Sequence, residues 1–426
     1  MNVRDTILTI NSADPEYVRA INQHSREMGI ELKGLSLIDK AYDREAPDRV
    51  KDTTGVYQEI ICDFDNPYAL QMALSPYMYR LLAVSTDYES AVQPLNKVLP
   101  FLPYIPKPSE SSLLWSTEKP LMRDRMSTYD TKLTPKYQYM EASDVSNVDD
   151  LVKDFEFPVI VKPSDLAKAL LVTECKDMKD LKKCLKHTFE VIDEVYSREH
   201  RRNTPSVLIE EFMQGDMYST DAYVTTDGDI YCLPLVKVVT ADSIGLPGFY
   251  SYRHIIPVSL SPSEVKAAFE AARSSVRALN LCATSTHIEL IYTSNGWKII
   301  ELGARMGGYR QLLYKEAYGV EHYYNDLSVR MGNKPVMPGK PIKHAAGVNI
   351  YSDQEGIIES IEGINEASKL ESVIFVRTRA KAGDEALFAS NGGDLIVDGI
   401  LSNTDADKLE SDVARLRQLV KIKIKS

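Results

Sequence analysis

The segment THIELIYTSNGWKIIELGARMGG, residues 286–308, decides the fold. Two apolar runs flank the turn sequence Ser294-Asn295-Gly296, and this pattern predicts an antiparallel β-hairpin. Each run contains one glutamate, Glu289 in the first and Glu301 in the second. Because a buried carboxylate needs a partner to offset its desolvation, these two side chains are the first candidates for a functional site.

The length of the turn determines whether the two glutamates face each other. A two-residue turn would place Glu289 and Glu301 on opposite faces of the hairpin. A three-residue loop at 294–296, with its glycine in the left-handed conformation, would pair Thr293 with Trp297 and set the glutamates directly across from each other. We expect the three-residue loop.

Opposed carboxylates would repel each other, because opposed residues have Cα atoms only about 4.5–5.5 Å apart. One divalent ion, or two ions about 3.5–4 Å apart, would relieve that repulsion. Oxygen ligands favour Mg²⁺, with Mn²⁺ as a second possibility, so the hairpin predicts a metal site at Glu289 and Glu301. Arg305 follows on the turn that leaves the hairpin, where it could meet a phosphate or an oxyanion. The alternative is a structural ion pair between one glutamate and His287 or Arg305.

This hairpin resembles the metal-binding hairpin of the ATP-grasp superfamily, whose pattern ends in E…E-x-N-x-R followed by glycines. Further segments resemble other ATP-grasp motifs in the same order: EKPLMRDRM (118–126), FPVIVKP (157–163), VLIEEFMQG (207–215) and RHIIPVSLS (253–261). The match extends from about residue 80 to residue 335 and is nearest in pattern to the L-amino-acid ligase branch, which forms dipeptides.

The resemblance implies roles for the matching residues. The nucleotide-binding residues would be Lys119, Lys162, Glu210, Glu211, Phe212, Met213 and Asp216. Arg305 and His254 would act in catalysis, Glu289 and Glu301 would bind the metal, and His287, Gly307 and Gly308 would contact substrate. Each of these residue types also has a common structural explanation, such as a solvated lysine, an exposed acidic pair or a structural histidine.

The chain departs from the family pattern at three places. The loop SDLAKALLV (164–172) contains no glycine, although backbone amides must approach the phosphates there. We expect Lys168 to substitute for those amides as a point charge. The strand that would hold adenine is followed by Gly215-Asp216-Met217, where the family usually carries a glutamate that contacts the ribose. The third metal ligand, often asparagine, is Gly303, which leaves open whether one or two ions bind.

Alternating strand and helix patterns precede these motifs. DTILTIN (5–11) reads as a strand, Asp14-Pro15 opens a helix, and Gly29 stands where a helix ends. The alternation repeats as far as RLLAVSTD (80–87), which predicts a parallel, doubly wound sheet. Clustered prolines between Pro100 and Pro120 indicate a domain boundary.

We therefore expect an α/β and α+β multidomain protein, in which a doubly wound parallel sheet precedes ATP-grasp lobes with antiparallel sheets. The expected divisions are an N-terminal Rossmann-like domain (1–115), a small ATP-grasp lobe (116–206), a large lobe with the metal hairpin (207–335) and a C-terminal extension that completes the large lobe (336–426).

Composition limits the classes of partner. The 50 basic and 61 acidic residues give a net charge of −11, which argues against nucleic-acid binding and against an anionic membrane surface. The first residues do not resemble a signal peptide, and no run is long and apolar enough to span a bilayer. The five cysteines are scattered without a C-x-x-C pair, which favours a reducing cytoplasm. A homodimer is possible.

The expected activity is an ATP-dependent ligation. A carboxylate, an amino acid or small peptide-like acid, would be activated by ATP as an acyl phosphate, and an amine would then displace phosphate. The cofactors would be ATP and Mg²⁺. One alternative is a nucleotide-binding protein that has lost catalysis, and another is a ligase whose acceptor is not an amine.

Overall fold

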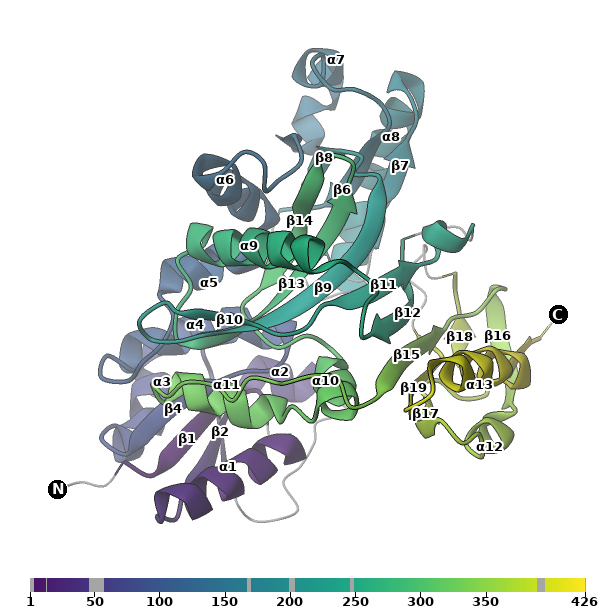
Figure 1. Cartoon of the computed structure of the whole chain (residues 1–426). Helices are drawn as coiled ribbons and strands as arrows, with labels where there is room; N and C mark the ends of the chain where they lie inside the picture. Colours follow the sequence, from purple (N-terminus) through teal and green to yellow (C-terminus); the bar gives the residue numbers. More distant parts are fainter. Residues whose placement is uncertain are drawn as a thin grey trace.

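The computed structural model describes residues 4–12, 14–45, 57–166, 170–198, 204–245, 249–388 and 395–425. Figure 1 shows the N-terminal sheet at the bottom, a long curved sheet through the middle, a small lobe at the top and the C-terminal segment at the right.

The N-terminal sheet is parallel, as predicted. Its strands lie in the order β3-β2-β1-β4: β1 (Thr6–Ile10), β2 (Lys33–Asp39), β3 (Tyr57–Cys62) and β4 (Leu81–Ser85). The connecting helices are α1 (Pro15–Met28), α2 (Lys40–Glu45) and α3 (Pro67–Leu74). Asp14 caps α1 through its side chain, and Gly29 ends that helix in the left-handed conformation. The sequence signals for this helix are confirmed.

The small lobe follows a run of helices. These helices are α4 (Val92–Val98), α5 (Glu110–Thr117) and α6 (Lys119–Tyr129). The lobe contains an antiparallel sheet of order β5-β8-β6-β7: β5 (Tyr137–Met140), β6 (Val159–Pro163), β7 (Thr173–Cys175) and β8 (Val207–Glu211). It also contains α7 (Val148–Leu151) and α8 (Met178–Arg198). A separate apolar core fills this lobe, and residues of β6 and β8 are part of that core.

The large sheet is antiparallel and runs from the hairpin at residues 284–303 into the C-terminal segment. Its order is β14-β13-β9-β11-β12-β15-β19-β17, with β10 paired to β9. The strands are β9 (Gly215–Val224), β10 (Ile230–Cys232), β11 (Val236–Thr240), β12 (Ser251–Ile256), β13 (Thr284–Thr293), β14 (Gly296–Gly303), β15 (His344–Ile350), β17 (Val373–Thr378) and β19 (Val397–Asn403). The associated helices are α9 (Pro262–Ala278), α10 (Arg310–Tyr318) and α11 (His322–Arg330). Ser261 and Glu264 form the predicted capping box of α9.

A small sheet and two helices complete the C-terminal segment. The sheet has the order β18-β16-β20: β16 (Gly356–Glu362), β18 (Glu385–Ala386) and β20 (Lys421–Ile424). The helices are α12 (Ile364–Ala367) and α13 (Ala406–Leu419), and α13 lies over this segment in Figure 1. Among the described residues, none of the helices has the length and apolar character needed to cross a membrane.

The β13–β14 hairpin brings the two glutamates together, but not through the turn that the sequence predicted. Glu289 pairs with Glu301, as expected. The predicted three-residue loop is wrong, because Thr293 pairs with Gly296 and leaves a two-residue turn. The Thr293 hydroxyl donates to the Gly296 carbonyl oxygen at 2.8 Å and accepts from the amide of Asn295 at 3.1 Å. These side-chain hydrogen bonds close the shorter turn.

A β-bulge corrects the register between the turn and the glutamates. Leu290 pairs with Ile299, whereas the next pair along the hairpin is Glu289 with Glu301, so Ile300 is an additional residue. Without a bulge, the two-residue turn would have placed the glutamates on opposite faces. The bulge, and not the turn, therefore places Glu289 opposite Glu301.

Candidate active site

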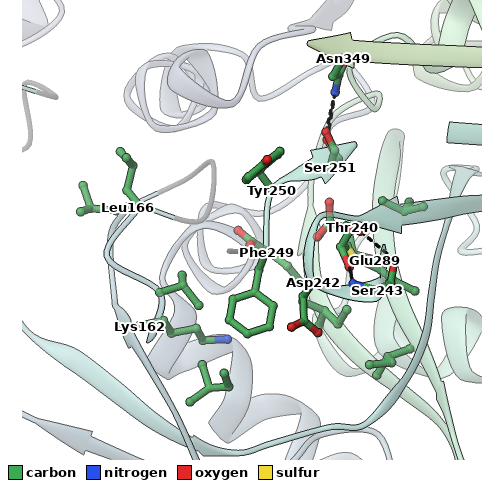
Figure 2. Close-up of a pocket in the computed structure, with 18 of the residues that line it drawn as sticks. Lys162, Leu166, Thr240, Asp242, Ser243, Phe249, Tyr250, Ser251, Glu289 and Asn349 are labelled. Carbon is green, nitrogen blue, oxygen red and sulfur yellow. Dashed lines mark hydrogen bonds between the residues drawn. The ribbon is translucent and has the colours of Figure 1, made fainter. Parts of the chain in front are cut away.

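A cavity of about 1370 Å³ lies where the parts of the chain meet. Its walls include Glu89 from the N-terminal segment, Lys162 from β6, Glu301 from β14 and Arg379 just after β17. Figure 2 shows Lys162 and Leu166 on one side of the cavity and Ser251 and Asn349 on the other. Side chains from both lobes can therefore reach one bound molecule.

Lys162 is held at the cavity wall by a buried ionic network. Its ammonium lies 2.7 Å from Glu210 Oε2, and the guanidinium Nε of Arg123 donates to Glu210 Oε1 at 2.7 Å. The exposed fractions are only 9% for Lys162, 3% for Glu210 and 1% for Arg123. Burial lowers the pKa of Lys162 to about 8 despite the attraction of Glu210. Burial would raise the pKa of Glu210, but Arg123 and Lys162 outweigh it and lower that pKa to about 2.

Arg123 also binds the bulge of the β13–β14 hairpin. Its Nη1 donates to the carbonyl oxygen of Ile299 at 3.2 Å, and its Nη2 donates to that of Ile300 at 2.7 Å. The guanidinium of Arg123 therefore connects the carboxylate of Glu210 on β8 to the backbone that sets the position of Glu301. The segment EKPLMRDRM contains Arg123, but no sequence signal assigned this residue a role, since its partners at residues 299 and 300 are distant in the chain.

Lys119 connects the small lobe to the β13–β14 hairpin. It is the first residue of α6, and its ammonium donates to the carbonyl oxygen of Leu166 at 2.9 Å. The same ammonium lies 3.3 Å from Glu301 Oε1. Burial would lower the pKa of Lys119, but Glu301 more than compensates and the pKa is raised. Lys119 and Lys162 both line the cavity, as a pair of phosphate-binding lysines would. Lys168 lies outside the described residues.

The nucleotide-binding residues predicted between 210 and 216 divide into two groups. Glu210 and Glu211 at the end of β8, and Phe212 and Met213 directly after it, line the cavity. Asp216 does not belong to the cavity wall that the described residues form; its carboxylate instead pairs with the ammonium of Lys237 at 3.0 Å on an exposed surface. The structure thus brings four of these five predicted residues to the cavity.

The two glutamates of the hairpin both line the cavity. His287 Nε2 lies 3.5 Å from Glu289 Oε1. Burial raises the pKa of Glu289, but His287 outweighs it and keeps the net shift downward, so the carboxylate is ionised. Two opposed, oxygen-bearing side chains fit a hard divalent ion. Within the described ranges, no group of three or more His, Cys, Asp or Glu side chains is arranged to hold a metal ion.

Arg305 reaches the cavity beside the glutamates. Its Nε donates to Glu89 Oε2 at 2.7 Å, and its Nη1 donates to the carbonyl oxygen of Met306 at 2.9 Å. The sequence alternatives are thereby resolved in part. Glu289 does pair with His287, but Arg305 pairs with a glutamate from the N-terminal segment that sequence reasoning missed.

Asp221 anchors the back of the site. Its exposed fraction is 0%, its Oδ1 lies 2.7 Å from His287 Nδ1, and its Oδ2 lies 2.7 Å from His322 Nε2. Burial opposes ionisation of Asp221, but both histidines favour it and depress its pKa far below the usual range. The pKa of His287 is raised, because Asp221 outweighs the effect of burial. Asp221 therefore fixes the ring of His287 and its second nitrogen faces Glu289. The only sequence signal was an aspartate inside an apolar strand.

Gly307 and Gly308 have a structural rather than a cavity-lining position. The amide of Gly307 donates to Asp221 Oδ2 at 2.7 Å. A Cβ atom at Gly307 would lie 2.4 Å from His287 Nδ1, so this position requires glycine. Neither glycine lines the cavity as the described residues define it.

His254 lies in the cavity wall on β12. It is 5% exposed, and its Nδ1 has no hydrogen-bond partner among the described residues. Burial, with the nearby charge of Arg310, depresses its pKa well below the usual value, so the ring is neutral. A neutral imidazole can accept a proton or a hydrogen bond, which is the form that a general base requires.

The far end of the cavity is formed by Tyr309, directly before α10, and by Asn349 and Arg379 from the C-terminal segment. None of these three residues was identified from sequence. The Nδ2 of Asn349 donates to the carbonyl oxygen of Ser251 at 3.0 Å (Figure 2), and Arg379 Nε donates to Asp398 Oδ1 at 2.8 Å. This end can present amide, phenol and guanidinium groups to a polar substrate.

Comparisons with known proteins agree with this geometry. The family model described as ATP-grasp domain matches residues 155–312. The crystal structure of L-amino acid ligase from Bacillus licheniformis is similar over 100% of both chains, with a TM-score of 0.78 and 18% identity. That of N5-carboxyaminoimidazole ribonucleotide synthetase from Thermotoga maritima has a TM-score of 0.68 and 17% identity, covering 99% of this chain and 100% of the other.

Two curated relatives are longer proteins. The uncharacterized protein y4rH of Sinorhizobium fredii is 23% identical over 248 residues, which are 58% of this chain and 48% of the relative. Carnosine synthase 1 of Mus musculus is 27% identical over 139 residues, which are 32% of this chain and 16% of the relative. The chain therefore matches about half or less of each relative.

Proposed function

Because this chain carries an ATP-grasp domain on an ATP-grasp fold, we propose that it is an ATP-dependent, ADP-forming carboxylate–amine ligase. The observation that carries the proposal is the pairing of Glu289 with Glu301 in a cavity that also contains Lys119 and Lys162. Two carboxylates for a cation and two ammonium groups for phosphates are what a phosphoryl-transfer site needs.

In this proposal each charged residue has one task. Lys119 and Lys162 bind the phosphates, and Glu289 and Glu301 hold a magnesium ion, with manganese as a substitute. The ion supplies neutralisation of the phosphate charge when it is bound. Phe212 and Met213 lie directly after β8, where they can enclose the adenine ring and offer backbone groups to its edge. Asp216 retains no part in this assignment.

The chemistry consists of two transfers. An oxygen of the substrate carboxylate attacks the γ-phosphorus of ATP, and ADP leaves. The amine nitrogen then attacks the acyl carbon, phosphate leaves, and the nitrogen loses a proton. Arg305 lies beside the hairpin, where it can bind the oxyanion that forms at the acyl carbon. His254 is neutral and lines the same cavity, so it can take the amine proton.

An amino acid or a small peptide-like acid is the proposed carboxylate. Two observations support a polar substrate of this size. The cavity extends past the nucleotide residues to Asn349 and Arg379, and the similar structure of L-amino acid ligase covers this C-terminal segment as well.

The test is a matrix of amino acids, supplied singly and in pairs with ATP and Mg²⁺. We expect ADP and phosphate to appear in equal amounts, and only with a productive pair. A mass spectrum of the reaction should show the joined product. If ADP binds but no pair of acid and amine yields phosphate, the protein binds nucleotide without acting as this ligase. If phosphate forms with bicarbonate or a thiol instead, the acceptor is not an amine.

A further inference from the structure

Gly303 leaves a gap in the row of side chains that β14 presents to the cavity. Alternate residues of a strand share one face, so Glu301 and Gly303 of β14 face the cavity together, and Arg305 lines it just after the strand. The backbone of Gly303 is not in the left-handed region, so its conformation does not require glycine. Glycine instead leaves space for a neighbouring side chain, because a Cβ atom at Gly303 would lie 2.8 Å from Glu89 Oε2.

Glu89 fills that space from a different part of the chain. It begins the short 3-10 turn Glu89–Ala91, which follows β4 at the carboxyl end of the N-terminal sheet. Its carboxylate holds the Nε of Arg305 and lines the same cavity as Glu289 and Glu301. Lys119, whose ammonium lies 3.3 Å from Glu301 Oε1, lines the same cavity as Glu89.

Three carboxylates line this part of the cavity, Glu89, Glu289 and Glu301. Two of them already pair with a cation, because Lys119 lies 3.3 Å from Glu301 and Arg305 lies 2.7 Å from Glu89. His287 and Asp221 form their own pair behind the site. A divalent ion that entered this part of the cavity would therefore meet carboxylates from both the hairpin and the N-terminal segment.

We propose that Glu89 is the third carboxylate of the cation site and that it acts in the space that Gly303 leaves. This inference rests on the proposed function. Because the described residues hold no cluster of three direct ligands, Glu89 would bind the water that a magnesium ion retains. A carboxylate has two oxygens, so Glu89 can hold Arg305 with one and accept from a coordinated water with the other.

The competing explanation is that Glu89 only orients Arg305. The two explanations differ in what Glu89→Gln does. The amide oxygen of glutamine can still accept from Arg305 Nε, but the negative charge is lost. Cation affinity should therefore fall in this variant if Glu89 serves the ion, and should stay unchanged if Glu89 serves only the arginine.

The experiment measures Mg²⁺ and Mn²⁺ binding to the ADP complex of the full chain by calorimetry, with thermal melting as a check of folding. We expect Glu89→Gln to weaken cation binding by about tenfold or more, as loss of an outer partner of a metal site does. ADP binding without metal should change little. Glu110→Gln, an exposed carboxylate on α5, is the matched control and should behave like the wild type.

A second pair of variants tests the position itself. Gly303→Asn alone should weaken cation binding, because its Cβ would meet Glu89. In the Glu89→Ala background that space is free, and the asparagine oxygen can take the place of the lost carboxylate. The double variant Glu89→Ala/Gly303→Asn should therefore bind Mg²⁺ more tightly than Glu89→Ala.

Three results would overturn the inference. Unchanged cation affinity in Glu89→Gln, with only turnover reduced, would show that Glu89 orients Arg305 alone. A double variant no better than Glu89→Ala would show that the space beside Gly303 does not serve the ion. A wild-type ADP complex that binds no Mg²⁺ would overturn the proposed function together with the inference, which separates that failure from the other two.

Discussion

Glu289 lies directly opposite Glu301 across β13 and β14, and the additional residue Ile300 is what places them there. The carbonyl groups at the bulge are not left to solvent, because Arg123 donates to two of them while it also holds Glu210. The arrangement of the cation-binding residues is therefore tied to the nucleotide side of the cavity by one buried guanidinium. The predictions below follow from this connection and from the charges around it.

Replacement of either hairpin glutamate should remove cation-dependent turnover. We expect Glu301→Gln to reduce ADP formation at least about a hundredfold, since loss of a direct ligand should exceed loss of an outer partner. Glu289→Gln should be nearly as severe. Thermal melting should show both variants folded, because both side chains are partly exposed. Near-normal ADP formation in one variant would remove the metal assignment for that residue.

ATP and ADP affinity should depend on pH through Lys162. Its pKa is lowered to about 8 by burial, so the ammonium is charged below that value and neutral above it. Bound phosphates favour the charged form, so affinity should be constant below about pH 8 and should fall as pH rises further. Calorimetry at pH 7, 8 and 9 measures this. Lys162→Met should bind weakly at every pH, whereas Lys182→Met, at an exposed ion pair with Asp149, should behave like the wild type. A wild-type affinity that does not change between pH 7 and 9 would contradict the assignment.

Arg123→Lys should weaken both nucleotide and cation binding, although the charge is kept. A lysine cannot reproduce the planar set of donors that reaches Glu210 and the carbonyls of Ile299 and Ile300. We expect a fall of about tenfold or more in Mg²⁺ affinity of the ADP complex, comparable to loss of an outer metal partner. Arg125→Lys is the control, because Arg125 lies on the same helix and stacks on Trp115 instead. If only ADP binding weakens and Mg²⁺ binding does not, the bulge holds its shape without Arg123.

Asp221→Asn should destabilise the protein and lower the pKa of His287. Removing one partner of a buried ion pair costs about 3–5 kcal/mol, so the melting temperature should fall by several degrees. The pKa of His287 is raised in the folded protein. The stabilisation that protonated His287 gains from Asp221 is therefore present below about pH 6.5, the ordinary pKa of histidine. It is lost as pH rises through the raised pKa of His287.

The difference in melting temperature should accordingly be larger at pH 6 than at alkaline pH. Histidine NMR can follow the titration directly. Asp227→Asn, in an exposed turn, is the control and should leave both the melting temperature and the His287 titration unchanged. An unaltered His287 titration in Asp221→Asn would show that Asp221 does not set the charge of that ring.

Much of the local structure was determined by the sequence alone. Asp14-Pro15, Gly29 and the Ser261–Glu264 capping box specify helix ends through contacts within a few residues, and the structure has them where the sequence placed them. The alternation of apolar strands and helices likewise specified a parallel sheet. The motifs around Lys119, Lys162 and the hairpin indicated which lobes would form and in what order. These signals are local or follow a short period, so they can be read from a single chain.

The site itself depended on contacts that only the tertiary structure provides. The turn sequence predicts the opposition of Glu289 and Glu301 through a three-residue loop, but its cause is a bulge whose carbonyls accept from Arg123, 176 and 177 residues away in the chain. Asp221, Glu89 and Arg379 were not identified, because their partners are distant in sequence. A buried charge is stable only where the fold supplies its counter-charge and hydrogen bonds, and no periodicity of the sequence records which distant residue does so.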